Sequence, residues 1–165
     1  MNDYQYDEYV GNETLKKEYK LFTFYPRGTN IDQNNESLCE HLLTSGQWVY
    51  NEQVLDNLDF YLENYIPKYA AAYINSNCEG EMFIGISDDG FVKGIPYKGD
   101  LCEKDIKNKI DSILRSDLLI SSSDINKYID TELIKVNTNK FKFNKSQNKI
   151  VKKYFNQKKK YRIMM

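Results

Sequence analysis

Two aspartates, Asp88 and Asp89, stand at the end of a short apolar run in the segment EMFIGISDDG. The run, residues 81–87, has the composition of a central strand, and a charge at the end of a buried strand is costly unless something compensates it. Two interpretations follow from these residues alone. Either a divalent cation compensates the carboxylates, or the aspartates open a hairpin turn, where Asp-Gly is favoured.

Glu18 and Lys20 form a second group that could act on a phosphate. They are two residues apart in LKKEYKLFTF, residues 15–24, which has the composition of a strand, so they share one strand face. A carboxylate beside a lysine, with an aspartate on a neighbouring strand, is a workable arrangement for cleaving a phosphodiester bond. The expected cofactor is Mg²⁺ or Mn²⁺, a hard cation that prefers oxygen ligands and activates water. Lys20 would position the phosphate or stabilise the transition state.

Helices are predicted on both sides of the aspartate segment. Apolar residues recur at helical spacing over residues 51–77, where Pro67 either kinks the helix or starts a second one. A shorter helix is predicted over residues 36–46. Another is predicted over residues 98–118, with Asp100 as its N-cap.

Strands are predicted to alternate with these helices. Residues 90–95 follow the DDG turn and are the predicted hairpin partner of strand 81–87. A late strand is predicted over residues 128–137. The predicted fold class is therefore α+β, with a small mixed or antiparallel sheet flanked by helices.

The formal net charge of −1 conceals a strong asymmetry along the chain. Residues 131–165 contain 11 Lys and Arg against one acid, whereas residues 1–130 contain 12 bases and 23 acids. An acidic body with a basic end is common among nucleic-acid binders, because cations release the counterions of phosphate; a solubilising tail is the alternative. The candidate phosphate-contacting residues are Lys152, Lys153, Lys158, Lys159, Lys160 and Arg162.

The three cysteines, Cys39, Cys78 and Cys102, are an odd number and lie far apart, which predicts free thiols in a reducing compartment, the cytoplasm or the nucleus. No zinc site is expected, because His41 is the only histidine and nothing with ligand spacing complements it. No apolar run approaches 18 residues, so no membrane span is expected.

Two blocks of this sequence resemble the AlbA_2 domain of the Schlafen family. The first, ETLKKEYK, is similar to the family pattern E-x4-E-F-K. The second, YAAAYINSNCEGEMFIGISDDGFVKGI, is similar to Y-x-x-A-x-x-N, two glycines, an apolar strand, GVDD and a closing glycine. The resemblance extends over roughly residues 11–115, and the chain looks like a single lobe, as in short versions of the family such as viral ones. The chain departs from the pattern at Glu79, which replaces a glycine, and at Ser87 within GISDD.

The resemblance implies a carboxylate triad, because the ribonuclease members of the family use two glutamates and a strand-end aspartate to cleave transfer and ribosomal RNA. By position these would be Glu13, Glu18 and Asp88, acting as catalytic residues and metal ligands, with Asp89 as the alternative to Asp88. Glu13 and Glu18 are five residues apart and would face opposite ways on a straight strand. The triad therefore requires a bend in the chain between them.

The predicted organisation is an irregular segment over residues 1–10, an AlbA_2-like domain over 11–137 and a basic Lys/Asn-rich tail over 138–165. The implied function is a divalent-metal-dependent endoribonuclease acting on structured RNA such as tRNA. One alternative is a non-catalytic DNA- or RNA-binding module. Another is an interaction protein that pairs with a second Schlafen-like lobe, and a homodimer is one form of such pairing.

Overall fold

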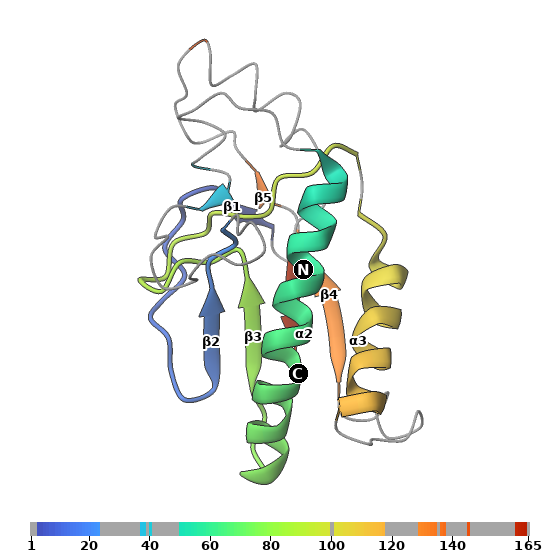
Figure 1. Ribbon diagram of the computed structural model, residues 1–165. Coiled ribbons are helices and arrows are strands. Elements are labelled where there is room, and N and C mark those ends of the chain that lie inside the picture. Colours follow the sequence, from blue (N-terminus) through green and yellow to red (C-terminus); the bar gives the residue numbers. More distant parts are fainter. Residues whose placement is uncertain are drawn as a thin grey trace.

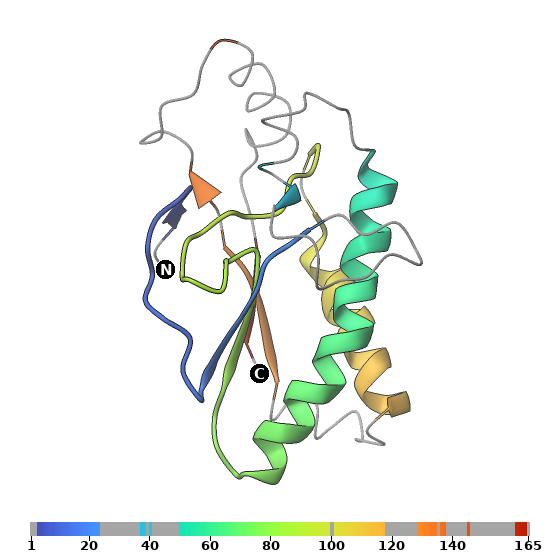
Figure 2. The same ribbon diagram turned by 60° about the vertical axis from the view of Figure 1, so that its left-hand side comes forward.

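In the part of the chain that it describes, the computed structural model has two layers, a mixed sheet and two helices that cover one of its faces (Figures 1 and 2). The two helices are α2 (Asn51–Asn75) and α3 (Glu103–Asp117), and they pack against each other as well as against the sheet. This arrangement confirms the predicted α+β class. The structure describes residues 3–23, 37–38, 40, 50–99, 101–117, 129–134, 136–137, 145 and 161–164.

The main sheet has four strands in the order β2-β3-β6-β4. The edge strand β2 pairs in parallel with β3, whereas β6 pairs antiparallel with both β3 and β4. Helix α2 connects β2 to β3, as a parallel pair requires a crossover. The strand bounds are β2 Lys17–Lys20, β3 Glu81–Ile84, β4 Asp130–Leu133 and β6 Tyr161–Met164.

A second, smaller sheet joins the N-terminal segment to the end of the late strand. Strand β1 (Tyr4–Gln5) pairs in parallel with β5 (Val136–Asn137). The prediction of one strand over 128–137 was therefore wrong in detail, because β4 and β5 belong to different sheets.

The core lies between the sheet and the helices. Alternation along β3 turns Met82 and Ile84 toward α2 and α3, whereas Phe83 meets Tyr19 of β2 on the other face, with ring centroids 5.7 Å apart. The helical residues of this core recur every three or four positions, as in an amphipathic helix. They are Val54, Leu58, Tyr61, Leu62, Ile66 and Ala70 of α2 and Ile106, Ile110, Ile113 and Leu114 of α3.

Helix α2 continues through Pro67 to Asn75, so the alternative of a second helix starting at Pro67 was wrong. The turn between α2 and β3 is tight: a Cβ at Gly80 would lie 2.2 Å from Cζ of Tyr73. Glycine is thus required at position 80 by the ring that packs over it.

Strand β3 leads into a hairpin, as predicted. Ile86 pairs antiparallel with Val92, and the Ser87 N–H donates to the Phe91 carbonyl at 2.9 Å. The Gly90 N–H closes the turn on the Ser87 carbonyl at 2.9 Å. Asp88 and Asp89 are the exposed residues inside this turn.

Strand β6 is the main departure from the predicted organisation. Its residues fall within the stretch predicted to be a basic tail, yet their backbone pairs with β3 and β4 on both sides. Most of the predicted helix over 36–46 lies outside the described residues. The predicted N-cap Asp100 also lies outside them. Cys78 and Cys102 are free thiols. None of the described helices is long and apolar enough to cross a membrane.

Candidate carboxylate site

The chain bends between Glu13 and Glu18, as the triad requires. Thr14 and Lys17 exchange two backbone hydrogen bonds, of 3.0 Å and 3.2 Å, so the chain reverses just before β2. The reversal carries Glu13 back along the strand, where its Oε1 accepts a hydrogen bond of 2.7 Å from the backbone N–H of Tyr19. Glu13 therefore lies beside β2 and close to Glu18.

Glu18 and Lys20 lie on the same face of β2, as predicted, and turn toward α2. The Lys20 Nζ is 2.9 Å from Glu18 Oε1, and the Tyr69 hydroxyl donates to the same oxygen at 2.8 Å. The Lys20 ammonium also lies 4.8 Å and 5.3 Å from the ring centroids of Tyr65 and Tyr69. Two aromatic rings and a carboxylate thus fix one cation at the edge of the sheet.

Asp88 reaches this group from the hairpin. The segment before Glu13 lies against the hairpin, because the Val10 N–H donates to the Gly90 carbonyl at 2.9 Å and the Tyr9 and Phe91 ring centroids are 5.4 Å apart. Asp88 is close enough for its charge to act on Glu13. Asp89 instead accepts a hydrogen bond from the Ser87 hydroxyl and borders a different pocket.

The pKa of Glu13 responds to the other charged residues of the site, Glu18, Asp88 and Lys20. Burial of its carboxylate raises the pKa of Glu13, the Tyr19 N–H lowers it, and the negative charges of Glu18 and Asp88 raise it again. Lys20 offsets part of this effect, yet the pKa of Glu13 stays above its ordinary value. Burial alone would lower the pKa of Lys20, but its hydrogen bonds to Glu18 and Tyr69 raise it well above the ordinary value. Lys20 therefore stays charged at neutral pH.

The donor set fits a hard divalent cation in its chemistry. Carboxylate oxygens are the ligands that Mg²⁺ prefers. Burial is the largest cause of the raised pKa of Glu13, and a cation would relieve the smaller contribution that comes from the charges of Glu18 and Asp88. Within the described ranges, no three Asp, Glu, His or Cys side chains are placed to hold a metal between them. Mg²⁺ usually binds one or two carboxylates and takes its remaining ligands from water and substrate phosphates, so a three-residue cage is not required.

Of the six predicted phosphate-contacting residues, Arg162 alone lies within the described residues. Lys152, Lys153, Lys158, Lys159 and Lys160 lie outside the described residues. Arg162 is in β6, where its backbone pairs with Glu132 of β4.

Sequence reasoning missed Tyr69 and Tyr65, which complete the site from α2. The available signal was their spacing: they are four residues apart on one helix face, and Tyr69 opens the Y-x-x-A-x-x-N block. Which strand they would meet could not be read from the sequence, because that depends on how α2 crosses the sheet.

Fold and site together define a two-layer α+β domain whose edge strand carries carboxylates beside a fixed lysine. The chain belongs to the Schlafen AlbA_2 family: the family model described as "Schlafen, AlbA_2" matches residues 47–163. Membership implies a role connected with nucleic acids. The matched range includes Tyr69 and Asp88 but begins after Glu13 and Glu18. No curated protein and no solved structure gave a match.

Proposed function

We propose that this protein is an endoribonuclease that cleaves structured RNA, such as tRNA, at the group formed by Glu13, Glu18, Asp88 and Lys20. The observation that carries the proposal is electrostatic. Burial raises the pKa of Glu13, and the charges of Glu18 and of Asp88, which comes from a remote segment, add to this effect. Repulsion among carboxylates costs stability, and acids with perturbed pKa values are common at active sites.

Lys20 supplies the positive charge for the phosphate. Tyr65, Tyr69 and Glu18 hold its ammonium in place, so little reorganisation is needed when a phosphodiester approaches. Burial is the largest cause that raises the pKa of Glu13, and a raised pKa suits a group that takes a proton from the attacking water. Tyr69 orients Glu18 through its hydroxyl.

The expected cofactor remains Mg²⁺ or Mn²⁺. One or two of the carboxylates of Glu13, Glu18 and Asp88 would hold it, with water and substrate phosphate as its other ligands, and when bound it would supply an activated water and neutralise charge on the scissile phosphate.

Purified protein incubated with end-labelled tRNA is expected to give discrete fragments in Mn²⁺ or Mg²⁺ and none in EDTA. Gel electrophoresis of the products measures both arms. Full activity in EDTA would support the proposed nuclease activity but contradict its dependence on a divalent metal. RNA binding without fragments in any buffer would instead establish the non-catalytic binding module. A stable complex with a second protein lobe and no RNA affinity would contradict both.

A further inference from the structure

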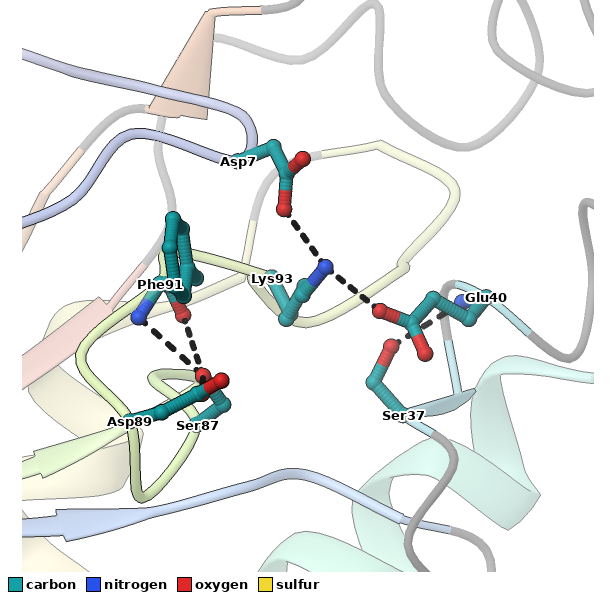
Figure 3. A network of polar contacts seen from close by, with 7 residues as sticks. All are labelled: Asp7, Ser37, Glu40, Ser87, Asp89, Phe91 and Lys93. Carbon is teal, nitrogen blue, oxygen red and sulfur yellow. Dashed lines mark hydrogen bonds and ion pairs between the residues drawn. The ribbon is translucent and has the colours of Figure 1, made fainter.

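A second polar group lies beyond the carboxyl ends of the parallel strands β2 and β3 (Figure 3). It borders an open pocket of about 360 Å³, within the size range of small-molecule sites. Carboxyl ends of parallel strands are a common place for ligands. The pocket is lined by Asp7, Leu21, Glu40, Ser87, Asp89, Phe91 and Lys93.

Lys93 organises this pocket by joining two segments that are remote in sequence. Its Nζ is 2.5 Å from Asp7 Oδ1 and 2.6 Å from Glu40 Oε1. Figure 3 shows the ammonium lying between the two carboxylates. Asp7 is held at a φ of +63°, an uncommon conformation for a residue other than glycine, so its position is set by its surroundings.

The lining is rich in hydrogen-bond acceptors and has one aromatic wall. Three carboxylates, those of Asp7, Glu40 and Asp89, line the pocket together with one ammonium group. This excess of negative charge repels a phosphate and favours a neutral group that donates hydrogen bonds. Phe91 provides an aromatic surface of the kind on which unstacked bases pack.

We propose that this pocket binds one unpaired guanine base of the RNA, an inference that rests on the proposed function. Guanine presents two adjacent N–H donors on its Watson–Crick edge, and a carboxylate accepts such a pair in two parallel hydrogen bonds. Adenine, cytosine and uracil each place an acceptor beside their donor on that edge, so they match a carboxylate less well. Asp89, exposed at the rim, accepts the guanine edge while Phe91 packs on the ring.

The pocket is adjacent to the carboxylate site through two pairs of consecutive residues. Lys20 belongs to the site and Leu21 to the pocket, and Asp88 belongs to the site and Asp89 to the pocket. Consecutive Cα atoms are only about 3.8 Å apart, so the pocket and the carboxylate site are neighbours both at the end of β2 and in the hairpin. On this proposal the nucleotide whose base is bound in the pocket lies next to the carboxylate site. Cleavage would therefore occur next to a guanosine.

The test is binding of uridine-rich RNA octamers that carry guanosine, inosine or uridine at one central position. Inosine lacks only the 2-amino group of guanosine. Fluorescence anisotropy in EDTA is expected to show about tenfold tighter binding of the guanosine octamer than of either other octamer. Asp89→Asn is expected to reduce this preference below about twofold, as is Phe91→Leu. Asp56→Asn, which changes the charge equally on the exposed side of α2, should keep it.

Equal binding of the three octamers by the unaltered protein would overturn the pocket proposal, and so would no binding at all. A guanosine preference in a protein that never cleaves RNA would support the pocket proposal and contradict the proposed nuclease activity. Cleavage of tRNA with no preference for guanosine would support the nuclease activity and contradict the pocket proposal.

Discussion

Replacing Glu13 with glutamine is expected to lower the rate of RNA cleavage by about 10²–10⁴-fold while leaving RNA affinity intact. Glutamine keeps the size of the side chain and can still accept the hydrogen bond from the Tyr19 N–H. It cannot take up a proton or contribute negative charge. Glu18→Gln and Asp88→Asn should reduce the rate by similar factors, because each removes one charge from the same group.

Single-turnover rates on labelled tRNA measure the first effect, and filter binding in EDTA measures the second. Glu52→Gln is the matched control, since it makes the same chemical change at an exposed position about 25 Å along α2 from Tyr69. If Glu13→Gln and Glu18→Gln both cleaved as fast as this control, the carboxylate site would not be the catalytic site.

Replacing Gly90 with alanine is expected to lower the free energy of unfolding by about 3 kcal/mol. Two costs combine at this position. Its φ of +91° is strained for any residue with a side chain, and a Cβ would lie 2.1 Å from the carbonyl oxygen of Gly11. That oxygen belongs to the backbone and cannot move aside without displacing the segment that leads to Glu13. The variant should therefore also lose cleavage activity, because Asp88 would move away from Glu13.

Gly99→Ala separates the two costs. Gly99 has a φ of +83°, and a Cβ there would meet nothing within 4 Å, so only the backbone strain of about 1 kcal/mol is expected. Thermal unfolding followed by circular dichroism should show a drop in Tm about three times larger for Gly90→Ala than for Gly99→Ala. Equal drops would mean that the N-terminal segment does not pack against the hairpin as described.

The elements predicted from local signals are the ones that the structure confirms. The DDG turn and its hairpin depend on neighbouring residues, and the inward stripe of α3 depends on spacing within one helix, so the sequence is sufficient for both. Strand pairing depends on residues far apart in the chain. Neither the parallel pairing of β2 with β3 nor the place of β6 beside β3 leaves a local signal.

The candidate site divides in the same way. The shared strand face of Glu18 and Lys20 follows from a two-residue period, and the bend after Glu13 follows from requiring two glutamates to converge. The contribution of Tyr69 and the junction of Asp7, Glu40 and Lys93 could not be predicted. Both arise where segments remote in sequence pack together.

The position of β6 has a consequence for synthesis of the chain. In the described sheet β6 lies between β3 and β4, so the four strands come together after residues 161–164 have been made. Until then, a nascent chain carries two hydrogen-bonding edges that can pair with another polypeptide. Strand β6 thus completes the four-stranded sheet and removes a route to aggregation.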